Sequence, residues 1–257
     1  MPDCQNCTHL RIDKCLAFPP EWPQTPVNAL RACVVGITQE YCSLITRHSR
    51  VLEVGCGAWS PVRQHCINVG AKWEGIEISG DCCGLPSIAT RIESVEALSF
   101  PDGSFDIVIG NQTLEHWYEY GCRMQVGLWQ CFRVCTVGGW VLMNVPIHFH
   151  GARMFVSGDL PSIEALFTPY SNRVSMSAWR RNPGPLRTVQ LLPGSGAPSA
   201  YNLDIRAQRT TEVIPPRPSP YRVRIRLWRE LRDHGWSDVS SRAQRRLRAL
   251  CTVKHRN

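Results

Sequence analysis

The sequence predicts an α/β protein with a doubly wound, mostly parallel sheet. Short apolar segments alternate with helical ones, and their spacing leaves room for a crossover helix between parallel strands. The first apolar segment, residues 50–57, runs directly into an acidic residue and a Gly-x-Gly turn. Gly55 and Gly57 let the backbone turn sharply and pass close to a ligand, with Glu53 at the end of the strand. This arrangement is typical of a site for a nucleotide-type cofactor.

The composition is that of a globular protein of ordinary polarity. The 257 residues are 43% hydrophobic and 19% charged, which allows a substantial buried core. No apolar run reaches the roughly 18 residues of a membrane span. The first residues, Met-Pro-Asp-Cys, lack the pattern of a secretion signal. We therefore expect a cytoplasmic protein without a membrane partner, made of one main domain with an insertion.

A short Cys- and Pro-rich segment, residues 1–26, precedes the main domain. Cys4 and Cys7 have a spacing typical of zinc ligands, and Cys15 is a third candidate. His9, Cys33 or Cys42 can supply a fourth ligand. The pattern predicts a structural zinc, with unligated thiols as the alternative, because a second Cys-x-x-Cys pair is missing. The other cysteines are expected to be buried or without function.

Residues 27–146 are predicted to form the sheet domain. A helix is expected over residues 28–47, where apolar side chains recur at three- and four-residue steps. The predicted strands are Val51–Val54, Trp73–Ile78, Arg91–Val95, Phe105–Gly110 and Trp140–Val145, and helices are predicted at Pro61–Val69 and Gly121–Val134. The second strand ends in Glu77, about 20 residues after the glycine turn, where a partner for ribose hydroxyls is expected.

The remaining chain departs from this alternation. Residues 147–220 are rich in Pro, Gly and Ser and predict an inserted cap that contributes to substrate binding. In residues 221–257 a helix over Arg222–Gly235 and strands at Ser237–Ser241 and Leu250–His255 are predicted to complete the sheet. Most of the excess positive charge lies in residues 206–257, within a net charge of +8. Such a run can contact nucleic acid, although it is more often a solvated face.

Four segments together resemble the S-adenosylmethionine-dependent methyltransferases with the Rossmann-like seven-stranded fold, particularly the branch that acts on small molecules. The segments are Val-Leu-Glu-Val-Gly-Cys-Gly at 51–57, Gly-Ile-Glu-Ile-Ser at 75–79, residues 99–116 from Ser-Phe-Pro-Asp-Gly to Leu-Glu-His, and Gly-Gly-Trp-Val-Leu-Met-Asn-Val-Pro at 138–146. The resemblance implies a transferase with a Rossmann-like fold and S-adenosyl-L-methionine as cofactor.

The same resemblance implies which residues bind the cofactor. They are Glu53, Gly55, Cys56 and Gly57 at the methionine end, Glu77 and Ile78 at the ribose, Ser94 and Val95 at the adenine, and Asn111 and Gln112 lining the pocket. Ser94 stands where the family often has Asp, so we expect adenine recognition through the Val95 backbone amide and apolar packing. Ser60 stands where dinucleotide-binding proteins favour a third glycine, which disfavours NAD.

Three histidines are candidate catalytic residues. His148 and His150 follow the fifth predicted strand and His116 follows the fourth, at the strand ends where ligands bind in an open parallel sheet. A neutral imidazole can remove a proton from a hydroxyl acceptor. Alternatively His148 and His150 bind a metal together with Asp159. For Asp159 the local sequence also predicts the N-cap of a helix.

The predicted function is O-methylation of a small polar metabolite or saccharide, since the cap segment is rich in aromatic side chains, Arg and Asn. An RNA methyltransferase and a catalytically silent cofactor-binding protein remain as alternatives. Against an RNA substrate, the segment after the fourth strand lacks the Asn/Asp-Pro-Pro-Tyr pattern, and the one after the fifth lacks Pro-Cys.

Overall fold

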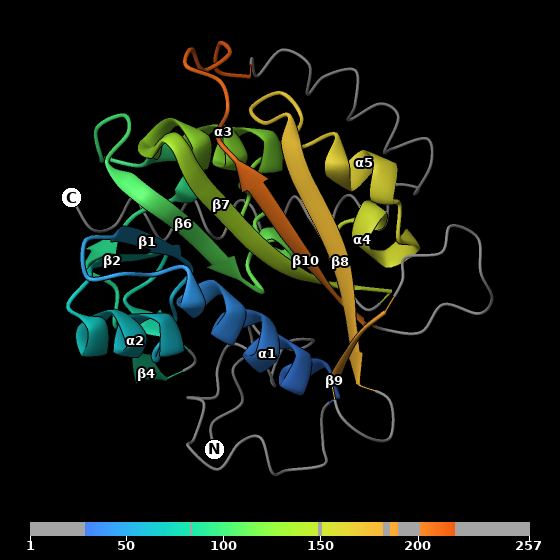
Figure 1. Ribbon diagram of the computed structural model, residues 1–257, viewed down its shortest axis with the longest axis horizontal. Helices are drawn as coiled ribbons and strands as arrows, with labels where there is room; N and C mark the ends of the chain where they lie inside the picture. Colours follow the sequence, from blue (N-terminus) through green and yellow to red (C-terminus); the bar gives the residue numbers. More distant parts are fainter. Residues whose placement is uncertain (1–28, 83, 149–150, 182–185, 190–200, 219–257) are drawn as a thin grey trace.

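The computed structural model describes residues 29–82, 84–148, 151–181, 186–189 and 201–218 (Figure 1). Several sequence predictions lie outside these residues: the N-terminal segment with Cys4, Cys7 and Cys15, the candidate base His150, and every element expected after residue 218. In the part of the chain that is described, no helix is long and apolar enough to cross a membrane.

The described residues form a central eight-stranded sheet in the order β5-β2-β1-β6-β7-β10-β8-β9. Its strands are β1 (Arg50–Val54), β2 (Lys72–Glu77), β5 (Arg91–Ile92), β6 (Phe105–Asn111), β7 (Cys135–Ile147), β8 (Arg173–Arg181), β9 (Leu186–Val189) and β10 (Tyr201–Gln208). Strands β5, β2, β1, β6 and β7 are parallel, and β10 runs antiparallel to both β7 and β8. A separate short hairpin joins β3 (Asp81–Cys82) to β4 (Leu85–Pro86). The predicted α/β fold with a mostly parallel, Rossmann-like sheet is thereby confirmed.

The order of the strands creates a switch point between β1 and β6. From β1 the chain moves outward through β2 to β5, then returns to the other side of β1 as β6 and continues outward through β7. Ligands in open α/β sheets bind beyond the carboxyl ends of the strands at such a point. We therefore expect a ligand site among the loops that follow β1, β2 and β6.

The interval 147–220 differs from the inserted cap that we expected. It holds β8, β9 and β10, and β10 pairs with β7 from Tyr201–Ile147 to Gln208–Trp140. Among the described residues of this interval, helices α4 (Arg153–Ser157) and α5 (Leu160–Glu164) and the segment after Gln208 lie off the sheet. The strands that complete the sheet thus come from residues 173–208. The strands expected after Gly235 lie outside the described residues.

Helices cover both faces of the sheet, as the doubly wound prediction requires (Figure 1). Alternate strand residues such as Ile107 and Val108 belong to two different buried clusters. One cluster lies under α1 (Ala29–Ser43) and α2 (Pro61–Val69), and the other lies under α3 (Met124–Val134), α4 and α5. Both faces of the parallel strands are therefore buried, which accounts for their near-continuous apolar sequences.

Local capping explains where two predicted elements begin and end. Helix α2 has the predicted bounds because the Ser60 side chain accepts a hydrogen bond from the Arg63 amide and Gly70 closes the helix in the left-handed region. The strand predicted at Arg91–Val95 ends at Ile92, because Ser94 caps the short 3₁₀ helix η2 (Val95–Ala97). Polar side chains near chain reversals thus override the strand propensity of their neighbours.

Candidate active site

The glycine turn after β1 is fastened to the end of β2. Gly55 and Gly57 have φ values of 71° and 67°, in the left-handed region that favours glycine. The Gly55 amide donates to the Ile76 carbonyl at 2.9 Å, and the Gly57 amide donates to the Glu77 carboxylate at 3.0 Å. The glycine turn after β1 and the acidic end of β2, which the sequence singles out separately, are therefore in direct contact.

A pocket opens beside this turn, at the carboxyl ends of β1, β2 and β6. Its empty volume, including the open mouth, is about 360 Å³. The residues that line it are Val54, Gly55, Ile76, Glu77, Ile78, Glu93, Val95, Thr113, His116, Trp117, Tyr120 and Cys122. These residues include two carboxylates and no Lys or Arg, so the pocket favours a ligand with positive charge over one with phosphates.

Four of the predicted cofactor residues line this pocket: Gly55, Glu77, Ile78 and Val95. Gly57 contacts it through its bond to Glu77. Ser94 lies at its margin, where the hydroxyl is 3.2 Å from the Cys122 thiol, a pocket residue. Cys56 is buried beneath the turn.

Glu53 is directed away from the pocket. Its buried carboxylate accepts hydrogen bonds from the Ser60 hydroxyl at 2.5 Å and the Trp73 indole at 3.1 Å. Burial raises the pKa of Glu53 to about 7, against the opposing effect of these two bonds. Glu53 thus joins the turn to α2 and β2, and its effect on a ligand passes through the backbone of the turn.

Asn111 and Gln112 also lie outside the pocket lining. Gln112 is buried and has a φ of 49°, which is uncommon for a residue other than glycine. Its side-chain amide donates to Asn144 at 2.8 Å and to Asn202 at 3.1 Å. Asn144 in turn donates to Asn111 at 2.5 Å. This buried amide network holds the chain directly before Thr113 and His116, which do line the pocket.

His116 is the candidate base that the structure places in the pocket. It lies at the end of the 3₁₀ helix η3 (Leu114–His116) and is 1% exposed. Its Nε2 atom is 3.3 Å from the buried Glu115 carboxylate, and its Nδ1 atom is 3.3 Å from the Glu119 carboxylate. The imidazole therefore lies between two groups that stabilise its protonated form.

His148 is held by the helix that follows it. It has a φ of 59°, its Nδ1 atom is 3.1 Å from the Val156 carbonyl, and its ring packs against Gly158. Gly158 has a φ of 65°, in the left-handed region that favours glycine, and a Cβ atom there would lie 2.5 Å from His148 Cε1. His148 is absent from the residues that line the pocket.

Asp159 caps helix α5, as its local sequence predicts. Its carboxylate accepts hydrogen bonds from the Ser162 amide at 3.2 Å and the Ser162 hydroxyl at 2.6 Å, and these bonds lower its pKa. Within the described residues no group of three or more His, Cys, Asp or Glu side chains is arranged to hold a metal ion. The zinc expected at the N-terminal cysteines lies outside those residues and stays a prediction.

Seven pocket residues were missed by the sequence reasoning: Val54, Ile76, Glu93, Thr113, Trp117, Tyr120 and Cys122. Thr113, Trp117 and Tyr120 follow β6, which was already expected to end at the site. Trp117 is 4% exposed and its indole donates to the Thr113 hydroxyl at 3.1 Å. Their proximity to a strand end was a usable signal, whereas Cys122 enters the pocket only because the chain folds back toward Ser94.

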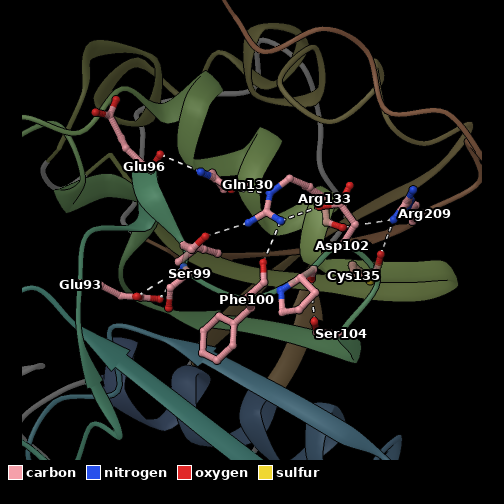
Figure 2. A network of polar contacts seen from close by, with 12 residues as sticks. Glu93, Glu96, Ser99, Phe100, Asp102, Ser104, Gln130, Arg133, Cys135 and Arg209 are labelled. Carbon is pink, nitrogen blue, oxygen red and sulfur yellow. Dashed lines mark hydrogen bonds and ion pairs between the residues drawn. The ribbon is translucent and has the colours of Figure 1, made fainter.

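One wall of the pocket is bound to helix α3 by a polar network (Figure 2). Arg133 donates to the carbonyls of Leu98 and Phe100 at 2.9 and 2.8 Å. Gln130 donates to the Glu96 carbonyl at 2.8 Å. These bonds satisfy backbone acceptors of the irregular segment between β5 and β6, so the segment that carries Glu93 and Val95 has a defined position.

Comparison with known proteins identifies the part of the chain that forms this site. Residues 52–143 match the family model described as a methyltransferase domain. This part of the chain is a methyltransferase domain. An uncharacterized methyltransferase, YcgJ of Bacillus subtilis, is 34% identical over an alignment of 77 residues that covers 26% of this chain and 30% of that protein. The chain thus spans less than a third of that curated relative. Together, the family model and this relative confirm the resemblance to S-adenosylmethionine-dependent methyltransferases.

Solved structures of methyltransferases are similar over 68–73% of this chain. A methyltransferase from Archaeoglobus fulgidus is 17% identical with a TM-score of 0.47, covering 68% of this chain and 94% of that one. A possible histamine N-methyltransferase from Thermotoga maritima is 15% identical with a TM-score of 0.45, covering 68% and 89%. A 1,6-didemethyltoxoflavin N1-methyltransferase from Burkholderia thailandensis is 14% identical with a TM-score of 0.46, covering 73% and 81%.

Proposed function

We propose that this protein transfers the methyl group of S-adenosylmethionine to a hydroxyl group of a small polar metabolite or saccharide. The observation that carries the proposal is the acidic pocket beside the glycine turn, in which Glu77 already binds the Gly57 amide. A pocket lined by carboxylates suits a cofactor whose net charge at the reacting end is positive. It disfavours the pyrophosphate of a dinucleotide, which needs cationic or amide partners.

The residues present fit this cofactor. The Glu77 carboxylate accepts two backbone amides, from Gly57 and Ile78, and its remaining lone pairs can accept the two hydroxyls of a ribose. The half-exposed Ile78 and buried Val95 offer apolar contact for a purine. Trp117 and Tyr120 offer aromatic faces, which attract a cation such as a sulfonium.

When bound, the cofactor supplies an already activated methyl group on a sulfonium. The protein then has to align the acceptor for in-line displacement and, for a hydroxyl, hold its proton. We assign the second task to His116. Glu119 is exposed at its carboxylate, so an acceptor hydroxyl can take its place at Nδ1. Glu115 then remains at Nε2 and stabilises the imidazolium that forms.

Calorimetric titration with S-adenosylhomocysteine tests the cofactor assignment. Wild type should bind, and Glu77→Ala should weaken binding roughly tenfold or more, because charge-assisted hydrogen bonds to the ribose are lost. Glu164→Ala removes an exposed carboxylate on α5, outside the pocket, and should bind as wild type does. Absence of wild-type binding at millimolar ligand, or unchanged binding by Glu77→Ala, would refute the assignment.

The catalytic assignment needs a substrate found by screening hydroxylated metabolites with labelled cofactor. With it, His116→Asn should lower kcat by roughly 10²–10⁴-fold while cofactor affinity stays nearly unchanged. His148→Asn serves as the matched control and should retain activity if His116 is the base. Loss of activity only in the His148 variant would transfer the role to His148. A protein that binds the cofactor and turns over no acceptor would be the catalytically silent alternative.

A further inference from the structure

Helix α3 contains a buried glycine, Gly127, as its fourth residue, although glycine is a poor helix former. The space in which its side chain would lie is already filled. A Cβ atom there would lie 2.6 Å from Trp117 Cζ3, 2.7 Å from Trp117 Cε3 and 3.1 Å from Val95 Cγ1. Trp117 and Val95 both line the cofactor pocket, whereas Gly127 does not.

Polar contacts on both sides of Gly127 keep α3 close to this wall of the pocket. At the start of α3, the Arg123 guanidinium and amide donate to the Glu96 carboxylate at 2.9 and 2.6 Å. One turn after Gly127, Gln130 donates to the Glu96 carbonyl, and Arg133 donates to Leu98 and Phe100 (Figure 2). The helix therefore cannot move away from an added methyl group without breaking several of these bonds.

The neighbouring buried positions of α3 offer no room either. Leu128, Cys131 and Phe132 are fully buried in the cluster between α3 and the sheet. Protein interiors are close-packed, so an added methyl group displaces whichever neighbour is least constrained. Within the described residues the Trp117 indole is held by a hydrogen bond to Thr113, and the ring edge with Cε3 and Cζ3, which meets α3, is the part that would be displaced.

We propose that Gly127 is a positioning residue for the cofactor: by lacking a side chain it sets the place of Trp117 and Val95, and thereby the shape of the pocket. This inference rests on the proposed function. This role differs from ordinary core packing, because a substitution at Gly127 is expected to change ligand binding through the position of the Trp117 ring.

The test is calorimetric titration of S-adenosylhomocysteine into four proteins: wild type, Gly127→Ala, Trp117→Phe and the double variant. Alanine is the better helix former, so Gly127→Ala should keep α3 yet raise the Kd roughly tenfold or more. Phenylalanine lacks the outer part of the indole, so it leaves room for the methyl group. The double variant should therefore bind within about threefold of Trp117→Phe alone.

The control is Gly80→Ala, which adds a methyl group where no atom lies within 4 Å, and it should bind within about twofold of wild type. Wild type that fails to bind refutes the proposed function. Wild type that binds, with Gly127→Ala binding equally well, refutes the positioning role alone. Strictly additive losses in the double variant also refute it. Should Gly127→Ala not fold, a folded double variant that binds like Trp117→Phe supports the proposal, and an unfolded one overturns it.

Discussion

The two halves of the sheet are assembled by different kinds of contact. In the cofactor half, β1, β2 and β5, side chains bond across short sequence distances: Ser60 to Glu53 over 7 residues and Gly57 to Glu77 over 20. In the distal half, β7, β10 and β8, buried bonds join residues much farther apart in the sequence: Gln112 to Asn202 over 90 residues and Tyr41 to Asp204 over 163. The first half can thus form its site from neighbouring segments, whereas the second depends on the complete fold.

Removing the most buried ion pair of the distal half should have the largest effect on stability. Asp204 is 1% exposed, and its carboxylate accepts hydrogen bonds from Arg206 at 2.7 and 2.9 Å and from the Tyr41 hydroxyl at 2.7 Å. Asp204→Ala leaves Arg206 and Tyr41 without this partner and should cost about 3 kcal/mol or more of unfolding free energy. Urea unfolding measures the loss.

The matched control is Tyr41→Phe, which removes only the hydroxyl that contacts Asp204 and the Met143 carbonyl and should cost about 1 kcal/mol. If the two halves are independent, the folded Asp204→Ala protein should bind S-adenosylhomocysteine nearly as wild type does. An equally large loss of cofactor affinity would show that the distal half also shapes the pocket, and the comparison would fail.

This difference also explains what the sequence could predict. The Gly-x-Gly turn, the acidic end of β2 and the Ser60 cap are local signals, and the strands and α2 around them were predicted nearly to the residue. Strands β8 and β10 carry a period-two pattern, with Val174, Met176 and Ala178 in one and Leu203, Ile205 and Ala207 in the other. Their surroundings are rich in Pro, Gly and Ser, which favour irregular structure, and for this reason the sequence predicts a cap there instead of strands.

The site shows the same division. Glu77 and the glycine turn were predicted, because a cofactor loop needs those residue types at a fixed spacing. The side chains of Glu53, Asn111 and Gln112 were expected at the ligand, yet they bond to partners in the fold instead. Sequence indicates that a polar residue follows a strand, but only tertiary packing determines whether it turns toward the pocket or into the buried network.

Glu53 offers a pH-dependent test of the cofactor half. Burial raises its pKa to about 7 in the folded protein, above the usual value near 4.5. Between these pH values the folded protein binds a proton that the unfolded chain has released, so stability falls as the pH rises toward 7. Glu53→Gln keeps an oxygen acceptor for Ser60 and Trp73 without the charge. It should therefore be more stable than wild type at pH 8, by up to about 3 kcal/mol.

Urea unfolding at pH 5, 6, 7 and 8 should show the gap between Glu53→Gln and wild type widening with pH and levelling off above 7. Asp106 is a suitable control, because its ion pair with Arg50 lowers its pKa and Asp106→Asn should change stability in the opposite sense at neutral pH. A gap that does not depend on pH would mean that Glu53 is ionised throughout, and the account of its burial would be wrong.

Substitution of Ser60 should have a smaller effect on stability but a measurable effect on ligand affinity. Its hydroxyl accepts the Arg63 amide at 3.0 Å as the N-cap of α2 and donates to Glu53. Ser60→Ala should cost about 1–2 kcal/mol and weaken S-adenosylhomocysteine binding a few-fold, since α2 begins directly after the glycine turn. Ser60→Thr keeps the hydroxyl and should restore most of both losses. If Ser60→Ala lowers stability but leaves ligand affinity unchanged, the N-cap of α2 does not influence the glycine turn.

The smallest effect is expected at Asp159, the exposed cap of α5 on the distal side. Because its carboxylate only caps a short helix, Asp159→Ala should lower the Tm slightly, and Asp159→Asn, which can still accept the Ser162 amide, should lower it less. Cofactor affinity and methyl transfer should stay at wild-type levels in both variants, with or without a chelator.

Activity that is lost in Asp159→Ala and recovered with a divalent ion would contradict this, because it would make Asp159 a metal ligand together with His148 and His150. The catalytic role assigned to His116 would then have to be reassigned to a metal-bound group on the distal side.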